Sequence, residues 1–245
     1  MTRVLTIDIG NTAAKGSVFE QDRLLMTMIC DNHDADSLIR MAEEYGCEGA
    51  VFCNVAGRDH EFGERLRKSL GRPVLELTSE TPLPIDVEYA TPQTLGVDRI
   101  AAAAGAVYKY GGNVLVVDAG TAVTLDLVSE GRFMGGNISP GLRLRFRSLN
   151  RFTARLPLVW PDGEMPERGR DTETAIRCGV VGGLVSEIAG EYNETKKKYQ
   201  DIRLIMTGGD ADFLLPMLAE RGVEGEIDHE LVGLGLVTIY YYNRQ

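Results

Sequence analysis

Two short segments of this chain combine an acid, a glycine and hydroxyl or amide side chains, each directly after an apolar run. The first is Asp8-Ile9-Gly10-Asn11-Thr12, after Val4-Leu5-Thr6-Ile7. The second is Asp118-Ala119-Gly120-Thr121-Ala122, after Val114-Leu115-Val116-Val117. Glycine lets a backbone approach a ligand closely, threonine and asparagine donate hydrogen bonds without bulk, and an acid at a strand end can hold a metal ion. Two such loops facing each other would bind the phosphates of a nucleotide and its cation, as in a kinase.

The first loop continues to Lys15, so the segment from Asp8 to Lys15 offers both a carboxylate and an ammonium to phosphate and magnesium. It lacks the Gly-x-x-x-x-Gly-Lys-Ser/Thr pattern and is not a Walker-type loop. Taken alone, it could be an ordinary hairpin with a polar tip. A third glycine loop, Thr207-Gly208-Gly209-Asp210, precedes a predicted helix, whose first amides could bind adenosine phosphates. A plain helix cap explains that loop equally well.

Gly96-Val97-Asp98-Arg99 opens another predicted helix. An acid in a first helical turn is often explained by the positive end of the helix dipole. As a functional pair, Asp98 could take a proton from an alcohol, and Arg99 could bind a carboxylate or phosphate. Further on, the dense turn cluster 135–141 must bring backbone close to its own helix or to a ligand. The arginine-rich stretch after it suits a solvated helix face, or pairing with the acids of another subunit.

Hydrophobic periodicity predicts the elements that position these motifs. In the first half we expect strands over 3–9, 14–19, 23–29, 49–55 and 74–77, and helices over 36–45, 60–70 and 97–110. In the second half we expect strands over 114–117, 122–128, 132–135 and 202–206, and helices over 139–155, 172–199, 211–221 and 230–241. Three strands followed by alternating helices and strands, twice over, predict two α/β halves built from one duplicated βββαβαβα unit. The halves are residues 1–110 and 111–245.

The composition narrows the class of protein. The 245 residues are 44% hydrophobic and 25% charged, with a net charge of -10. That charge repels polyanions, so nucleic acid is not expected as a partner. The four cysteines form no Cys-x-x-Cys pair, which favours reduced thiols over a disulfide or zinc site. No signal peptide or membrane span is predicted, and we expect a cytoplasmic protein without membrane partners.

With these motifs in hand, the chain closely resembles the type III pantothenate kinases of the acetate and sugar kinase/Hsp70/actin superfamily. The resemblance covers nearly the whole chain. It is carried by five ordered motifs, namely Asp8 to Thr12, Gly96 to Arg99, Asp118 to Ala122, Gly135 to Gly141 and Thr207 to Asp210. It implies two actin-like (ribonuclease H-like) halves with a nucleotide cleft between them. It also implies ATP-dependent phosphorylation of pantothenate to 4'-phosphopantothenate, the first step of coenzyme A biosynthesis.

The resemblance also implies roles for individual residues. Asp98 resembles the family's general base. The pantothenate site is expected from Tyr89, Gly96, Val97, Asp98, Arg99 and, across a homodimer, Thr172. The ATP site is expected from Asp8, Ile9, Gly10, Asn11, Thr12, Ala13, Ala14, Lys15 and Thr121, together with Gly208 and Gly209 of the third loop.

Two cations complete the expected site. Asp8 is expected to help place Mg²⁺, and Asp118 resembles the ligand for a monovalent cation, K⁺ or NH₄⁺. The chain departs from the family at Ala13-Ala14, where a further polar residue is frequent before the lysine. The loop from Pro157 to Gly169 matches no motif of the family.

Two other functions stay open at this level. One is a non-catalytic relative acting as an accessory factor in gene regulation, although such a protein has no need for a base and two cation-binding acids. The other is a superfamily phosphotransferase with a different acceptor. Without the resemblance, the residues themselves indicate only a nucleotide-dependent phosphotransferase.

Overall fold

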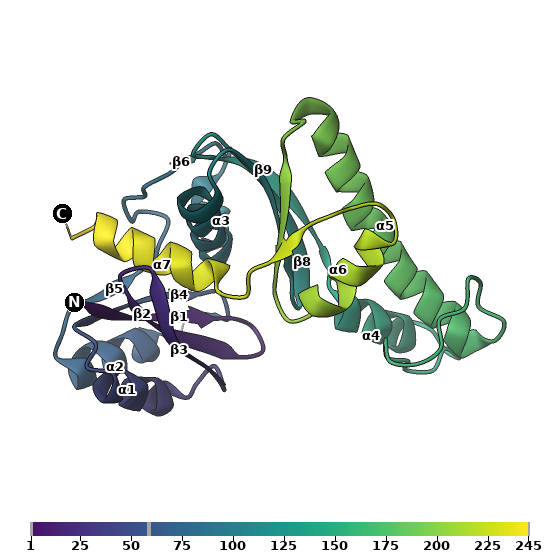
Figure 1. Cartoon of the computed structure of the whole chain (residues 1–245). Coiled ribbons are helices and arrows are strands. Elements are labelled where there is room, and N and C mark those ends of the chain that lie inside the picture. Colours follow the sequence, from purple (N-terminus) through teal and green to yellow (C-terminus); the bar gives the residue numbers. More distant parts are fainter. Residues whose placement is uncertain (1, 58–59, 245) are drawn as a thin grey trace. The chain divides into compact units, whose positions relative to one another are not determined.

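The computed structural model of the chain describes residues 2–57 and 60–244 (Figure 1). Its contacts divide it into two compact units. Unit 1 comprises Met1–Gly112, Val128–Gly135 and Glu230–Gln245, and unit 2 comprises Asn113–Leu127 and Gly136–His229. The C-terminal helix therefore packs in the same unit as the N-terminus. The predicted halves 1–110 and 111–245 describe a duplication in the sequence, whereas the two units describe how the chain packs. The two halves therefore remain a prediction.

Unit 1 is built on a five-stranded sheet of order β3-β2-β1-β4-β5. Its strands are β1 (Arg3–Ile9), β2 (Ala14–Glu20), β3 (Arg23–Cys30), β4 (Gly49–Asn54) and β5 (Val74–Glu76). The first three form an antiparallel meander, whereas β4 lies parallel to both β1 and β5. The parallel strands β1 and β4 end at the same edge of the sheet, and this edge carries Asp8.

Helices cover both faces of this sheet (Figure 1). Leu5 and Ile7 of β1 belong to a core cluster with residues of α1 (Ala35–Glu44) and α2 (His60–Leu70). The opposite face of β1 packs against α7 (Leu231–Tyr242), which also contacts α3 (Val97–Tyr110) extensively. Because side chains alternate along a strand, Asp8 points to the face of Val4 and Thr6, where α7 and α3 lie.

Helices α3 and α7 cross at two glycines. A Cβ on Gly105 would meet the backbone of Leu231, and one on Gly235 would meet the carbonyl of Ala101. The absence of side chains at both positions lets the two backbones pack directly against each other. This contact fixes α3, and with it the position of Asp98 in its first turn.

The second sheet repeats the strand order of the first. It runs β11-β10-β7-β8-β9, with the short β6 (Asp86–Val87) added beyond β9. Unit 2 contains most of this sheet, whereas β6, the end of β8 and the start of β9 belong to unit 1. The strands are β7 (Asn113–Ala119), β8 (Ala122–Ser129), β9 (Arg132–Pro140), β10 (Arg203–Thr207) and β11 (Glu226–Ile227). The order fifth-fourth-first-second-third is that of unit 1 read from the other edge. The predicted α/β fold of two related halves is confirmed by this topology.

Three helices pack in unit 2: α4 (Leu142–Phe152), α5 (Thr172–Lys198) and α6 (Ala211–Ala219). Their apolar residues join Leu115 and Val117 of β7 in one core cluster, to which the long α5 contributes residues from Ile176 to Tyr192. Asp118 alternates with Val117 and therefore leaves this core for the other face of β7. Among residues 2–57 and 60–244, no helix combines the length and the apolar content that crossing a membrane requires.

Most elements lie where periodicity predicts them, and the main differences concern the segment 135–141 and three short elements. The cluster 135–141, predicted as turns, is largely strand, because β9 continues to Pro140 and α4 begins only at Leu142. Its small residues serve close strand packing: a Cβ on Gly136 would meet the carbonyl of Leu125 and the backbone of Asp126. The short elements β6, β11 and η1 (Pro92–Thr94) carry too few residues for a periodic signal and were not predicted.

Candidate functional site

Asp8 stands at the carboxyl end of β1 in unit 1. It is paired in register with Lys15 on one side and Cys53 on the other, and the Cys53 thiol donates to Asp8 Oδ1 over 3.4 Å. Burial, and to a lesser extent the charge of Asp98, raise the pKa of Asp8 from 3.8 to about 6, against the opposing effects of Cys53 and Lys15. The β1 strand end therefore carries a carboxylate whose negative charge is costly without a cation.

Asp98 lies in the first turn of α3. The backbone amide of Arg99 donates to Asp98 Oδ1 over 2.8 Å, which fixes the orientation of the carboxylate. Burial raises the pKa of Asp98 against the lowering effects of that amide and of the Arg99 guanidinium. A Cβ on Gly96, the residue before the helix, would lie 2.5 Å from Asp98 Oδ1, so only glycine leaves room for this carboxylate. Asp8 and Asp98 thus share one electrostatic environment within unit 1.

The loop between β1 and β2 is a tight polar turn. The Gly10 amide donates to the carbonyl of Ala13 over 3.0 Å, and Asn32 donates to the carbonyl of Gly10 over 3.3 Å. Asn11 and Thr12 at its tip are exposed, whereas Ala14 is buried. The turn leaves its polar side chains at the surface of the unit, where they can meet a phosphate.

Lys15 forms an ion pair with Glu230, whose Oε1 lies 2.7 Å from the lysine Nζ. The other carboxylate oxygen of Glu230 accepts from the Ser17 hydroxyl over 2.8 Å. Both ionic side chains keep about a quarter of their surface exposed, 26% for Lys15 and 23% for Glu230. Lys15 is therefore held beside the Asp8 loop by a residue more than two hundred positions away.

Arg99 is buried, with only 5% of its surface exposed. Its guanidinium carbon lies 6.0 Å from the ring centre of Tyr89 and 5.5 Å from that of Phe133. The two rings contact each other edge to face at 6.0 Å. The structure therefore brings the expected residues Tyr89 and Arg99 together and adds Phe133, which had no local sequence signal.

In unit 2 the β7–β8 loop is packed through glycine backbone. Gly208 has a φ of +87°, and a Cβ there would lie 2.5 Å from both Asp118 Oδ1 and the Ala119 carbonyl. Gly141 donates to the carbonyl of Thr121 over 3.0 Å and also has no room for a side chain. The structure thus brings together Asp118, Thr121 and Gly208, which lie far apart in the sequence.

The remaining part of the third glycine loop has a different environment. A Cβ on Gly209 would have open space around it, so this glycine is not required by packing. The Asp210 amide donates to the Ala119 carbonyl over 2.9 Å, which ties the loop to the end of β7. Burial raises the pKa of Asp210, opposed by the charge of Arg143. Gly209 is therefore the position where the loop backbone is open to a ligand.

Thr172 is the first residue of α5, after the N-cap Asp171. That cap forms a capping box with Thr174, in which each side chain bonds the other's backbone. Thr172 lines a broad groove of about 830 Å³ on unit 2, together with Phe152, whose surface is 84% exposed. The expected substrate contact therefore lies on an apolar surface of unit 2 at the end of α4.

The donors present suit cations that are also held by a ligand. Among the described residues, no group of three or more His, Cys, Asp or Glu side chains could hold a metal ion alone. Mg²⁺ in kinases is bound through one or two carboxylates plus phosphate oxygens and waters, a requirement that Asp8 meets. Asp118, with the Ala119 carbonyl near it, offers hard oxygen ligands of the kind that a monovalent cation prefers.

Three residues of this arrangement escaped the sequence interpretation. Cys53 could have been found, because it belongs to the predicted strand 49–55, which pairs with β1 and places Cys53 level with Asp8. Glu230 and Phe133 could not have been found this way, since their contacts with Lys15 and Arg99 depend on tertiary packing.

Comparison with known proteins identifies the family. The model of the type III pantothenate kinase family matches residues 4–194. A type III pantothenate kinase from Bacteroides fragilis is 42% identical over 241 residues, which cover 98% of each chain.

Two solved structures support the fold. A conserved protein from Campylobacter jejuni, described as a Baf family transcriptional activator, superposes with a TM-score of 0.65 and 24% identity over 98% of each chain. A ROK family glucokinase from Streptomyces griseus, in complex with glucose and AMPPNP, superposes with a TM-score of 0.56 and 13% identity over 99% of each chain. At these identities the two structures bear on the fold alone.

Proposed function

We propose that this chain, which belongs to the type III pantothenate kinase family, transfers the γ-phosphoryl group of ATP to the terminal hydroxyl of pantothenate. The products are ADP and 4'-phosphopantothenate, and the reaction opens coenzyme A biosynthesis. The observation that carries the proposal is the pairing of Asp8 and Asp98 in unit 1, where the charge of one raises the pKa of the other. Such a pair suits a site that both binds a cation and moves a proton.

Asp98 is the general base. Its carboxylate takes the proton of the pantothenate hydroxyl while the hydroxyl oxygen attacks the γ-phosphorus and the bond to the β-phosphate oxygen breaks. The Arg99 amide holds the carboxylate in position during this transfer. A pKa raised by burial makes the carboxylate a better proton acceptor than an ordinary aspartate.

ATP is bound by the polar turn after β1. The backbone from Asp8 to Ala14 and the Lys15 ammonium face the phosphates, and Lys15 is held in place by Glu230. Asp8 would hold Mg²⁺, which when bound neutralises charge on the transferred phosphoryl group. The small side chains of Ala13 and Ala14 leave room for phosphate but supply no hydrogen-bond donor.

Unit 2 contributes Thr121, Gly208 and Gly209 to ATP binding. Gly209 is the open position of its loop, whereas Gly208 shapes the loop around Asp118. Asp118 would hold K⁺ or NH₄⁺, which when bound offsets phosphate charge without occupying the magnesium position. The glycines position this carboxylate rather than contact the acceptor.

Pantothenate is bound by Tyr89 and by the segment from Gly96 to Arg99, with Asp98 at the reacting hydroxyl. Arg99 supplies positive charge for the pantothenate carboxylate from a position fixed between two aromatic rings. Its low exposure favours a specific and short-range interaction over general attraction of anions.

The enzyme acts as a homodimer in which Thr172 reaches the substrate of the partner subunit. The groove beside Thr172 supports this arrangement, because an apolar surface with a Phe152 exposed by 84% is costly in water and suited to a second copy. The expected site of action is the cytoplasm, where ATP is available. Neither a membrane nor nucleic acid is needed, in keeping with a net charge of -10.

The test is a coupled assay for ADP release with ATP, Mg²⁺ and K⁺, with and without pantothenate. Pantothenate-dependent turnover, with phosphopantothenate identified by mass spectrometry, is the expected result. Turnover with other alcohols but not pantothenate would overturn the choice of acceptor. No turnover in K⁺ or NH₄⁺ by folded protein would favour the accessory-factor function. Sedimentation velocity at micromolar concentration checks the dimer.

A further inference from the structure

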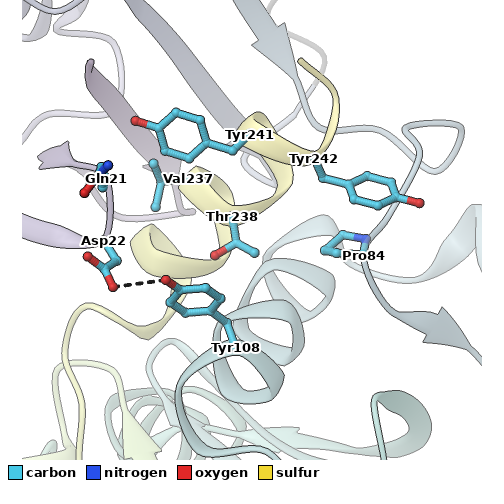
Figure 2. Close-up of a pocket in the computed structure, with 8 residues that line it drawn as sticks. All are labelled: Gln21, Asp22, Pro84, Tyr108, Val237, Thr238, Tyr241 and Tyr242. Carbon is cyan, nitrogen blue, oxygen red and sulfur yellow. Dashed lines mark hydrogen bonds between the residues drawn. The ribbon is translucent and has the colours of Figure 1, made fainter. Parts of the chain in front are cut away.

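A second hollow in unit 1 lies away from the candidate site. It has a volume of about 530 Å³ and is lined by aromatic side chains around one carboxylate, with Asp22, Tyr108, Tyr241 and Tyr242 as its main chemical groups (Figure 2). We refer to it as the tyrosine pocket. Glu20 pairs with Arg3 at one end of the β1–β2 ladder, whereas Lys15 pairs with Asp8 at the other. The turn that carries Asp22 is therefore about 17 Å along the sheet from Asp8.

The pocket wall is held by hydrogen bonds between its own elements. Tyr108 of α3 donates to Asp22 Oδ2 over 3.0 Å, as Figure 2 shows. Tyr241 of α7 donates to the carbonyl of Thr2 over 3.1 Å, and the Gln21 backbone bonds the same tyrosine. The β2–β3 turn, where Gln21 has a φ of +60°, is thereby tied to both helices. These contacts give the pocket a defined shape before any ligand binds.

The polar groups around the pocket are mostly hydrogen-bond acceptors. Tyr108, Tyr241 and Thr238 each give their hydroxyl proton to another protein group, the last to the carbonyl of Leu234 over 2.8 Å. Toward the pocket these oxygens present lone pairs, and the Asp22 carboxylate adds a negative charge. A ligand that binds these oxygens must therefore be a donor.

The charge of the pocket lining favours a cation. None of the described residues that line the pocket is a lysine or an arginine. The neighbouring Arg23 is bound to Glu20 over 2.7 Å. The last turns of α3 and α7 reach the pocket with Tyr108 and Tyr242, and helix carboxyl ends carry partial negative charge. Tyrosine ring faces attract cations as well.

We propose that the tyrosine pocket binds a small organic cation, a primary ammonium or guanidinium group on an apolar body. The cationic head lies at the Asp22 carboxylate and donates to it, while the apolar body packs against the rings of Tyr108 and Tyr242 and against Pro84. The volume matches pockets that take molecules of metabolite size. This site is independent of pantothenate phosphorylation, because it shares no residue with the proposed active site.

The test uses benzylamine and benzyl alcohol, which have the same shape and differ in charge at neutral pH. Binding to the full chain is followed by amide chemical shifts in nitrogen-15 NMR spectra at low salt. Benzylamine is expected to bind with a Kd of about 1 mM or below and to shift the amides of residues 21–23 and of Tyr108. Benzyl alcohol is expected to bind at least tenfold more weakly.

Variants locate the site. Asp22→Asn should weaken benzylamine binding at least tenfold, and Tyr108→Phe by about two- to fivefold, with benzyl alcohol unaffected. Glu44→Gln, which removes an exposed carboxylate on α1, is the matched control and should leave binding unchanged. Pantothenate-dependent turnover of Asp22→Asn checks that the variant is folded. Equal binding of amine and alcohol, shifts elsewhere in the protein, or full affinity in Asp22→Asn would each overturn the proposal.

Discussion

The loops after β1 and after β7 occupy equivalent places in two sheets of the same strand order, but their surroundings differ. Around Asp8 the neighbours are side chains: the Cys53 thiol, the Lys15 ammonium and the second carboxylate of Asp98. Beside Asp118 the backbone of Gly208 packs closely, since a Cβ added there would lie 2.5 Å from the carboxylate oxygen. The same fold thus supports a site of interacting charges in unit 1 and a site of packed glycines in unit 2.

This difference indicates which changes each unit tolerates. Charges that interact through side chains can be altered one at a time with little effect on the backbone. Substitutions at the unit 1 site should therefore change catalysis and its pH dependence. A loop that is packed through glycines has no room for an added Cβ. Substitutions in the unit 2 loop should therefore lower the stability of the fold. The following predictions test the comparison.

The largest effect is expected from Asp98→Asn. Loss of the general base should lower kcat by roughly 10²–10⁴-fold, because an amide cannot accept the hydroxyl proton. Binding of AMPPNP, measured by calorimetry, should stay within about twofold of the unaltered protein. Asp86→Asn, which changes an exposed acid of the same unit, is the matched control for kcat. Near-normal turnover of Asp98→Asn in steady-state kinetics would remove Asp98 from the catalytic role.

Gly208→Ala should lower the free energy of unfolding by roughly 2–4 kcal/mol. Its φ of +87° disfavours any L side chain, and the new Cβ would meet Asp118 and Ala119. Gly209→Ala has open space and a permitted backbone, so we expect a change below about 1 kcal/mol. Urea unfolding of the two variants measures both values. If the two variants were equally stable, the glycine-packed character of unit 2 would be refuted.

Asp8→Asn should stabilise the protein at neutral pH while impairing activity. The pKa of Asp8 is about 6 in the folded state against 3.8 for the ordinary group, so folding disfavours its ionised form. The resulting cost is absent below pH 4, grows as the pH rises to about 6, and reaches about 1–3 kcal/mol above that. The free energy of unfolding of Asp8→Asn should therefore exceed that of the unaltered protein at pH 8 and match it near pH 3.5. A difference that does not change with pH would contradict this account.

The smallest expected effect is that of the monovalent cation. K⁺ or NH₄⁺ should raise kcat several-fold over Na⁺ at constant ionic strength, because Asp118 provides a hard oxygen ligand for a larger ion. Asp118→Asn should remove most of this preference and leave the rate in Na⁺ similar. Equal initial rates in the three chloride salts would rule out a cation role for Asp118.

The elements of this fold could be predicted because their signals are local. The apolar runs of β1 and β7, and the apolar spacing in α1 and α3, depend on neighbouring residues only. The residues that contact the site residues could not be predicted from local signals. Glu230 is far from Lys15 in the sequence, and the packing of α7 brings the two together. The burial of Arg99 on α3 depends likewise on Phe133, which belongs to β9. The prediction of turns at 135–141 was wrong for a physical reason. Glycines are typical of turns, but here they allow close packing between strands.

The crossing of α3 and α7 through Gly105 and Gly235 has a consequence for synthesis of the protein. Because α7 follows unit 2 in the sequence, unit 1 cannot complete its core until the ribosome has passed residue 242. Most of unit 2, by contrast, is made before α7 emerges. The segments translated first are thus among the last to acquire their native packing, and a chain that ends early leaves the whole α7 face of β1 uncovered.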